Sequence, residues 1–292
     1  MYGVFFEEKY QRFERETPFD FSKRSSIGCG GLAETAFYPR TVAELVDLIK
    51  NLRQDGVPFY TLGNLTNVLP SDGAIQSVIV CTKKMRYEEN GTLFFPSGIS
   101  STKLLWACQR LQKSGAEFLE GIPCTLGGAL YMNAGVSGKY VAEILESVTV
   151  YREGEIIVLP VKDCDYTYKH SAFMDGKSVI LGASLRLINS DEANIAAARK
   201  RYKGRRAHLP QGRSMGCVFK NPDGQIAGKL IDGAGLKGLR VGGATVSETH
   251  ANFIVNDNRA TANDVRTLIG IIKQAVFAQY KIRLEEEIRY IT

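Results

Sequence analysis

The sequence has few cysteines and histidines, the usual ligands of structural zinc, and they do not cluster. Its 292 residues include six cysteines, which lie far apart with no C-x-x-C pair, and three histidines, which are equally scattered. Protein metal sites need such ligands at short, regular spacings, so we expect no structural metal. In a reducing compartment the six thiols should be free.

Long apolar runs are missing as well. The longest are short and interrupted, whereas a membrane-spanning helix needs about 20 mostly apolar residues, so we expect no membrane insertion. The amino-terminal stretch MYGVFFEEKYQRFERETPFD alternates aromatic and charged residues and lacks the basic start and apolar core of a secretory signal. With 44% apolar and 23% charged residues, the composition is that of an ordinary soluble globular protein, and we expect a cytoplasmic location.

The net charge of +6 is modest, and its densest part is the basic cluster RKRYKGRR at residues 199–206. No aromatic stacking platform or nucleic-acid-binding motif accompanies this cluster. It fits a solvated helix end, or a small anionic ligand, better than a nucleic acid. We therefore expect no nucleic-acid partner.

Predicted helices and strands are mixed without a strict βαβ alternation, which favours an α+β fold. Helical patterns cover residues 41–56, 101–115, 191–202, 227–232 and 261–280. Strand patterns are PFYTLG, SVIVC, LRVGG, ANFIVN and the closing RLEEEIRYIT, and SVTVYREGEIIVLP predicts a β-hairpin. The length suits two or three domains, and a shift in composition at residues 200–213 marks the best boundary.

Two loops are rich in glycine and small polar residues, as expected for loops that bind a phosphate-bearing cofactor. They are LGNLTNVLPSDG at residues 62–73 and GIPCTLGGALYMNAG at residues 121–135. Glycines let a ligand approach the backbone, and exposed N–H groups bind pyrophosphate. Neither loop is a G-x-G-x-x-G dinucleotide motif or a P-loop, and tight structural turns are the alternative interpretation of each. Two such loops in one domain favour a bound dinucleotide.

Five motifs occur in the order and approximate spacing of a known enzyme family: GIPCTLGGALYMNAG, YTYKHSAF, MGCVFKNPDGQIAGKLIDGAGLKG, GGATVSETHANFIVN and LEEEIRYI. Over residues 25–291 the chain resembles the UDP-N-acetylenolpyruvylglucosamine reductases, flavin enzymes of peptidoglycan precursor synthesis. The resemblance implies an FAD-binding region of the vanillyl-alcohol-oxidase kind at residues 1–200, with two subdomains split near 85–95. It also implies a smaller C-terminal α/β substrate domain at 201–292, whose final strand at 284–291 returns a catalytic glutamate to the flavin site. The short span before the Cys217 motif, and a chain ending just after LEEEIRYI, resemble the compact subgroup that lacks a substrate-covering insertion.

In this family NADPH reduces bound FAD, and the flavin passes a hydride to the vinyl carbon of an enolpyruvyl ether on a UDP-sugar. The resemblance implies Cys217 as the acid that protonates the neighbouring carbon, Lys169 as a cation beside the substrate carboxylate, and Glu287 as a stabilising carboxylate. Cys217 and Lys169 stand where the family usually has serine and arginine, and a lysine lacks the planar fork of arginine. Alternation puts Glu285 on the same strand face as Glu287, so the choice of Glu287 rests on the motif.

The resemblance also implies the residues that bind cofactor and substrate. The cofactor-binding residues are Gly63, Asn64, Leu65, Thr66, Asn67, Gly121, Ile122, Pro123, Gly127, Gly128, Asn133, Ala134 and Gly135. The substrate-binding residues are Lys220, Asn221 and Tyr168. Leu65 and Cys124 stand where the family has glycines, and a positive φ at Leu65 would be strained.

Plainer interpretations exist for the same residues. Cys217 could be a small buried hydrophobe and Lys169 a solvated surface lysine. For the whole protein, the alternatives are a diverged family member with another substrate and a non-catalytic sensor that binds flavin or a nucleotide sugar. The joint presence of Cys217, Lys220, Asn221 and Glu287 favours an enzyme, because a scaffold without turnover needs none of them.

Overall fold

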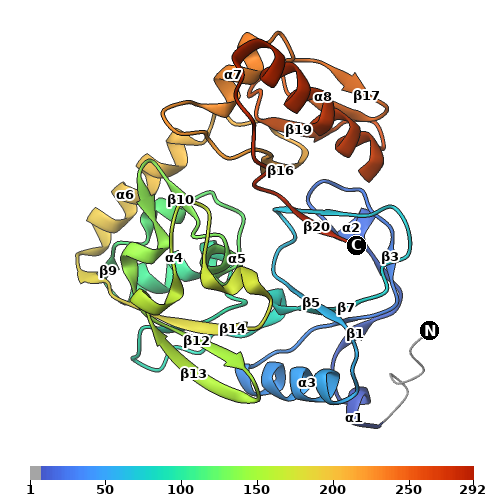
Figure 1. The fold of residues 1–292 in the computed structure, drawn as a ribbon. Helices are drawn as coiled ribbons and strands as arrows, with labels where there is room; N and C mark the ends of the chain where they lie inside the picture. Colours follow the sequence, from blue (N-terminus) through green and yellow to red (C-terminus); the bar gives the residue numbers. More distant parts are fainter. Residues whose placement is uncertain (1–7) are drawn as a thin grey trace. The chain divides into compact units, whose positions relative to one another are not determined.

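The computed structural model describes residues 8–292, which form two compact units that interleave along the chain (Figure 1). The first unit comprises the residues up to Glu16 with Thr35–Asn64 and Val78–Ala207, and the second comprises Thr17–Glu34, Leu65–Ser77 and His208–Thr292. The composition predicts a boundary at residues 200–213, whereas in the structure two earlier segments also belong to the second unit. Residues 1–7, part of the stretch that argues against a secretory signal, lie outside the described residues.

Polar contacts show why the early segment Thr17–Glu34 belongs to the second unit. The buried Asn256 side chain donates from Nδ2 to the carbonyl oxygens of Ile27 at 2.9 Å and Gly28 at 3.1 Å. Ser26 Oγ donates to the carbonyl oxygen of Ser214 at 2.6 Å. These contacts join residues that are far apart in sequence, so a change of composition along the chain does not reveal them.

The first unit contains two four-stranded sheets with covering helices. The helices are α1 (Glu8–Gln11), α3 (Val42–Gln54), α4 (Ser101–Arg110), α5 (Leu126–Tyr131) and α6 (Glu192–Arg205), and the 3₁₀ turns are η2 (Thr82–Lys84), η3 (Glu117–Leu119), η4 (Val141–Ile144), η5 (Val161–Cys164) and η6 (Ala172–Asp175). The strands are β1 (Arg15–Glu16), β4 (Ala36–Phe37), β5 (Phe59–Leu62), β7 (Val78–Cys81), β8 (Phe94–Pro96), β9 (Lys113–Ser114), β10 (Gly135–Val136), β11 (Lys139–Tyr140), β12 (Leu145–Arg152), β13 (Glu155–Pro160), β14 (Val179–Leu185) and β15 (Ile188–Asn189). One sheet has the order β1-β4-β7-β5, in which β4, β7 and β5 are parallel; the other has the order β13-β12-β14-β8 and is antiparallel.

The antiparallel sheet of the first unit is covered on both faces. Along β14, Val179 and Leu181 belong to the apolar cluster around α3, while Ile180 and Ala183 belong to the cluster that includes α4 and α5. Successive side chains of a strand point to opposite faces, and the irregular pairing with β12 between Ile180 and Gly182 shifts the alternation so that Ala183 shares the face of Ile180. Strand β14 therefore lies between these two layers of helices (Figure 1). This double burial explains why the sequence VILGASL is almost continuously apolar.

The second unit packs a long helix against a four-stranded antiparallel sheet. Its elements are β2 (Phe19–Asp20), α2 (Phe21–Arg24), β3 (Leu32–Ala33), β6 (Val68–Pro70), β16 (Arg213–Cys217), α7 (Ala227–Gly233), β17 (Arg240–Val241), β18 (Ala244–Val246), β19 (Phe253–Asn256), α8 (Ala262–Tyr280) and β20 (Arg289–Ile291). The sheet order is β16-β19-β18-β17, and β20 pairs separately with β6 in parallel. Leu268 and Ile272 of α8 share one apolar core with Ile254 of β19.

Several predicted elements are confirmed. Strands β12 and β13 form the predicted hairpin, with Arg152 opposite Glu155 and positive φ at Glu153 and Gly154, as a two-residue turn requires. Helix α3 begins after Thr41, whose side chain accepts the N–H of Glu44 at 3.1 Å. Helices α7 and α8 lie at the predicted positions.

Two predicted elements are too long. The helix expected at 101–115 ends at Arg110, because Gln112 adopts φ +52° and the chain then enters β9. The strand expected at 284–291 is regular only at Arg289–Ile291. Before it, the chain pairs with another partner: Lys220 N–H donates to the carbonyl of Glu285, and Glu287 N–H donates to the carbonyl of Val218, both at 2.8 Å.

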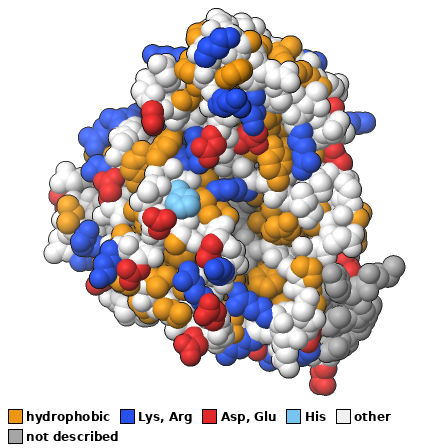
Figure 2. All heavy atoms as spheres, viewed as in Figure 1, with side chains coloured by type: hydrophobic (Ala, Val, Ile, Leu, Met, Phe, Trp, Pro, Cys, Tyr) orange, Lys and Arg blue, Asp and Glu red, His pale blue; other side chains and the backbone are white. Residues whose placement is uncertain are grey.

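The mixture of charged side chains on the surface is consistent with the modest net charge. On the face drawn in Figure 2, Lys and Arg side chains are interspersed with Asp and Glu. Within residues 8–292, no helix is both long and apolar enough to cross a membrane.

Candidate functional site

In the first unit, the two glycine-bearing loops lie against each other. Strand β5 leads into Gly63, and a Cβ atom at Gly63 would lie 2.1 Å from the Oγ1 atom of Thr125. The next residue, Asn64, donates from Nδ2 to the carbonyl oxygen of Pro123 at 3.3 Å. The start of the first loop and the middle of the second, which sequence analysis assigns to one cofactor, are therefore in direct contact.

Thr125 orders the second loop. Its Oγ1 atom accepts the N–H of Gly128 at 3.3 Å and caps the amino terminus of α5. Gly127 donates its N–H to the carbonyl of Ser97 at 2.7 Å, and a Cβ there would lie 2.9 Å from Ser97 Cβ. Gly63 and Gly127 are therefore positions where close packing excludes a side chain. Sequence analysis missed Thr125, although a threonine just before a helix is a usual capping signal.

The end of α5 holds the turn that carries Tyr168 and Lys169. Asn133, 5% exposed, donates from Nδ2 to the carbonyl of Thr167 at 2.8 Å and accepts the N–H of Ala142 at 3.3 Å. The predicted cofactor residue Asn133 thus has both ends of its amide engaged by the backbone. Within the turn, Thr167 and His170 exchange backbone hydrogen bonds, and Lys169 adopts φ +55°.

Ser171 fixes the same turn from its other side. Its fully buried hydroxyl donates to the carbonyl of Tyr131 at 2.7 Å. Tyr168 is 42% exposed, and its ring meets that of Tyr140 edge-on with centroids 6.4 Å apart. Lys169 is therefore presented on a turn whose two ends are fastened to the second glycine-bearing loop.

The chain passes from the first unit to the second between Asn64 and Leu65. Leu65 is 3% exposed and has φ +53°, the conformation in which sequence analysis expects strain for a residue with a Cβ. Thr66 and Asn67 follow, and Asn67 leads into β6. The predicted first cofactor loop is thus shared between the units, with Gly63 and Asn64 in one and Leu65–Asn67 in the other.

In the second unit, Cys217 ends β16 and is partly exposed. Asn252, 3% exposed, clamps the backbone just after it: Asn252 Oδ1 accepts the N–H of Phe219 at 2.9 Å, and Nδ2 donates to the carbonyl of Phe219 at 2.8 Å. The backbone carbonyl of Asn252 accepts the N–H of Val218 at 2.8 Å. Sequence analysis missed this residue, which lies within the motif THANFIVN.

Three other thiols of the chain are more deeply buried than Cys217. Cys29 and Cys108 are buried, and desolvation raises the pKa of each to about 12. Burial likewise raises the pKa of Cys164 to about 11. These thiols stay protonated at neutral pH and lie in apolar clusters. Cys217 is partly exposed, as is Cys124, and so differs from these three thiols in exposure.

Glu287 lies beside both the Cys217 segment and the first loop. Its N–H donates to the carbonyl of Val218, the residue after Cys217, at 2.8 Å. Its carbonyl accepts from Asn67 Nδ2 at 3.2 Å, and Asn67 in turn accepts the N–H of Arg289 at 2.9 Å. Three predicted site segments, those of Asn67, Cys217 and Glu287, therefore meet within the second unit.

The two predicted substrate residues after Cys217 have partners within the chain. Lys220 Nζ forms an ion pair with Glu285 Oε1 at 2.5 Å, with the lysine side chain 18% exposed and the glutamate 72% exposed. Asn221 accepts the N–H of Ala227, at the start of α7, on Oδ1 at 3.0 Å. Within residues 8–292, no group of three or more His, Cys, Asp or Glu side chains is arranged to hold a metal ion.

Comparison with known proteins agrees with this geometry. Residues 33–159 match the model of an FAD binding domain, and residues 208–291 match the model of the UDP-N-acetylenolpyruvoylglucosamine reductase C-terminal domain. The UDP-N-acetylenolpyruvoylglucosamine reductase of Caldicellulosiruptor saccharolyticus is 38% identical over 90% of this chain and 87% of its own length. That of Clostridioides difficile is 36% identical over 92% of this chain and 90% of its own length.

A solved structure shows the same likeness. The crystal structure of UDP-N-acetylenolpyruvylglucosamine reductase from Thermus caldophilus superposes with a TM-score of 0.81 at 32% identity, covering 96% of this chain and 99% of that one. The α+β fold class, with an FAD-binding portion before a smaller C-terminal domain, is therefore confirmed. The resemblance stated from the motifs is confirmed as well, and the chain belongs to the UDP-N-acetylenolpyruvoylglucosamine reductase family.

Proposed function

We propose that this protein is an FAD-dependent reductase that converts UDP-N-acetylglucosamine enolpyruvate to UDP-N-acetylmuramate with NADPH, in peptidoglycan precursor synthesis. The observation that carries the proposal is the meeting of Asn67, Cys217 and Glu287 in the second unit. A loop assigned to the cofactor, an acid and a carboxylate are the groups that this reduction needs near one another. A cytoplasmic location is part of the same proposal.

The residues of the glycine-bearing loops suit a flavin dinucleotide. Gly63 and Gly127 have no room for a Cβ atom, and Thr125 caps α5 within the second loop. Gly121 and Gly128 of the same loop are exposed. Loops of this kind offer backbone N–H groups to a pyrophosphate without side chains in the way. When bound, FAD supplies the hydride chemistry, while the protein supplies position and electric field.

Lys169 and Glu287 would act on the charge that develops on the substrate. Adding a hydride to the vinyl carbon places negative charge on the neighbouring carbon and its carboxylate. Lys169 offsets that charge as a point cation, held on a turn that Asn133 and Ser171 fasten in place. Glu287, whose backbone is hydrogen-bonded to Val218 and Asn67, would be the carboxyl group that helps to stabilise the intermediate.

Cys217 would deliver the proton from its Sγ atom to the substrate carbon. Cysteine thiols can act as general acids in enzymes. The Asn252 clamp on Phe219 fixes the backbone that carries the thiol. Lys220, Asn221 and Tyr168 would contact the substrate; for Lys220, binding an anionic group means exchanging its partner Glu285.

Two measurements test the proposal. The purified protein should show the visible absorption of oxidised flavin, or gain it on incubation with FAD. NADPH oxidation should then depend on the enolpyruvyl substrate. NADPH oxidation that ignores this substrate but responds to another enolpyruvyl or vinyl compound would favour a diverged enzyme. Flavin binding without any turnover would favour a sensor.

A further inference from the structure

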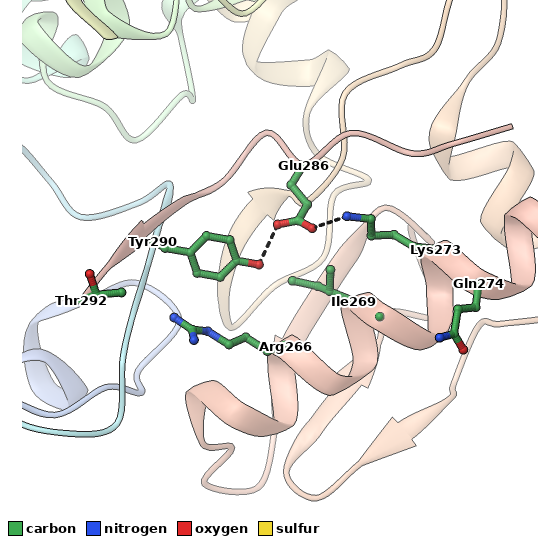
Figure 3. Close-up of a pocket in the computed structure, with 8 residues that line it drawn as sticks. Arg266, Ile269, Lys273, Gln274, Glu286, Tyr290 and Thr292 are labelled. Atoms are coloured by element: carbon green, nitrogen blue, oxygen red, sulfur yellow. Dashed lines mark hydrogen bonds and ion pairs between the residues drawn. The ribbon is translucent and has the colours of Figure 1, made fainter. Parts of the chain in front are cut away.

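One pocket of the second unit is lined by residues of helix α8 and of the closing segment, residues 284–292, including Glu286, the neighbour of Glu287. This open pocket has a volume of about 610 Å³ and is lined by Arg266, Ile269, Gly270, Lys273, Gln274, Glu286, Tyr290 and Thr292 (Figure 3). Both cations that line it already have partners. Lys273 pairs with Glu286, and the Arg266 guanidinium lies 4.7 Å from the centre of the Tyr290 ring. The two cations of the pocket therefore contact Glu286 and Tyr290 of the closing segment and are not arranged to bind a second anionic ligand.

Glu286 is the centre of this group. Lys273 Nζ donates to its Oε1 atom and Tyr290 Oη donates to its Oε2 atom, each at 2.7 Å, as the dashed lines in Figure 3 show. The Glu286 side chain is 20% exposed. Burial on its own raises the pKa of this carboxyl group, but the hydrogen bonds from Lys273 and Tyr290 outweigh burial and lower the pKa below its usual value. The carboxylate thus stays ionised and occupied at both oxygens.

Glu286 faces away from its two glutamate neighbours. The backbone from Glu285 to Glu287 is extended and pairs with the residues after Cys217, with Glu286 opposite Phe219. In extended chain, adjacent side chains point to opposite sides. Since Glu286 points to α8, Glu285 and Glu287 point the other way, and Glu285 accordingly reaches Lys220.

We propose that Glu286 is a positioning residue: by gripping Lys273 of α8 and Tyr290 of β20, it fixes the rotation of the closing segment and so aims Glu287 at the reaction centre. The inference rests on the role proposed for Glu287. Backbone hydrogen bonds to Val218 and Asn67 hold Glu287 in place along the segment. The contacts of Glu286 with Lys273 and Tyr290 then determine the direction in which the Glu287 side chain points.

The test separates the two half-reactions by rapid-mixing absorbance, using full-length protein loaded with FAD. Glu286→Ala should slow the re-oxidation of reduced flavin by the enolpyruvyl substrate by about 10- to 100-fold, because a misplacement of about 1 Å has this scale of effect. Flavin reduction by NADPH should keep its parent rate, and the KM for substrate should change much less than kcat.

Matched variants test the network itself. Glu286→Gln keeps an acceptor for Tyr290 but loses the ion pair, so it should fall between Glu286→Ala and the parent. Lys273→Met should slow re-oxidation about as much as Glu286→Gln does. The double variant Lys273→Met with Glu286→Gln should be little slower than either single variant, since both substitutions remove the same ion pair. Gln274→Ala, in the same pocket but outside this network, should re-oxidise at the parent rate.

Three results would overturn the inference. Parent-like re-oxidation in Glu286→Ala would show that Glu287 needs no such aid. Equal losses in both half-reactions would show a general structural effect. Additive losses in the double variant would show that Lys273 and Glu286 act separately. An inactive parent protein would instead overturn the proposed function, and with it the premise of this inference.

Discussion

Gly63→Ala tests whether the two glycine-bearing loops are locked together as the structure shows. The new Cβ would lie 2.1 Å from Thr125 Oγ1 and 3.1 Å from Thr125 Cβ. Thr125 is 1% exposed, so it has no open space to move into. Displacing its hydroxyl loses the cap of α5, worth about 1 kcal/mol, and forcing the loops apart adds about 1–3 kcal/mol of overpacking. We expect a loss of about 2–4 kcal/mol in the free energy of unfolding, together with loss of bound flavin.

Urea unfolding measures the first effect, and the flavin absorbance left after gel filtration measures the second. Gly128→Ala is the matched control for stability alone, because its Cβ would meet Thr125 Oγ1 at an ordinary 3.5 Å and lies in a helix, where alanine is favoured. Thr125→Ala should partly relieve Gly63→Ala, so that the double variant loses less than the sum of the single losses. A Gly63→Ala protein within about 0.5 kcal/mol of the parent that keeps its flavin would refute the close packing of the loops, since surface changes are usually that small.

Four further changes test other parts of the site. Cys217→Ala should slow flavin re-oxidation by substrate about 10²–10⁴-fold with flavin reduction unchanged, while Cys217→Ser stays active; equal rates in the alanine variant would exclude the thiol as the acid. Lys169→Ala should cost about 10²-fold or more in turnover and Lys169→Arg little, and near-normal turnover in the alanine variant would mark a surface charge. Leu65→Gly removes about 1–2 kcal/mol of strain at φ +53° but also a buried side chain whose loss costs about 2–5 kcal/mol, so urea unfolding should show a net loss even if flavin binds more tightly. Burial lowers the pKa of His250, so the unfolded chain takes up this proton first as the pH falls below about 6.5; stability should decline from there through the folded pKa, and this step should be missing in His250→Gln.

Local patterns predicted the elements that local chemistry determines. The hairpin of β12 and β13 was predictable because alternation and a Glu-Gly turn lie within one short stretch. The end of α4 was not, since Gln112 takes a positive φ without being a glycine. The interleaving of the units also escaped prediction: the parallel pairing of Val68 with Arg289 and the hydrogen bond of Asn256 to Ile27 join distant parts of the chain. Alternation and composition carry no information on such pairs.

The candidate site was likewise only partly predictable from the sequence. Glycine and small polar residues are the basis on which both loops are proposed to bind cofactor, and the glycine expected at position 65 indicated the positive φ that Leu65 adopts. The residues that hold those loops were harder to recognise. Thr125 and Asn133 act by capping or bridging backbone groups, and the partner of Asn133 at Thr167 lies 34 residues away. Motif matching names residues that face a ligand, whereas these roles appear only when hydrogen-bond partners are known.

The acidic run Glu285–Glu287 shows what the alternation of side chains does not predict. Alternation indicates that Glu285 and Glu287 share one face and Glu286 takes the other, but it does not say which face meets the rest of the unit. That choice depends on partners elsewhere in the chain: Lys273, 13 residues before Glu286, and Lys220, 65 residues before Glu285. Three identical carboxylates therefore have three different environments. Glu285 pairs with Lys220 and Glu286 anchors the segment to α8 through Lys273, whereas Glu287, whose N–H donates to the carbonyl of Val218, is the proposed catalytic carboxylate.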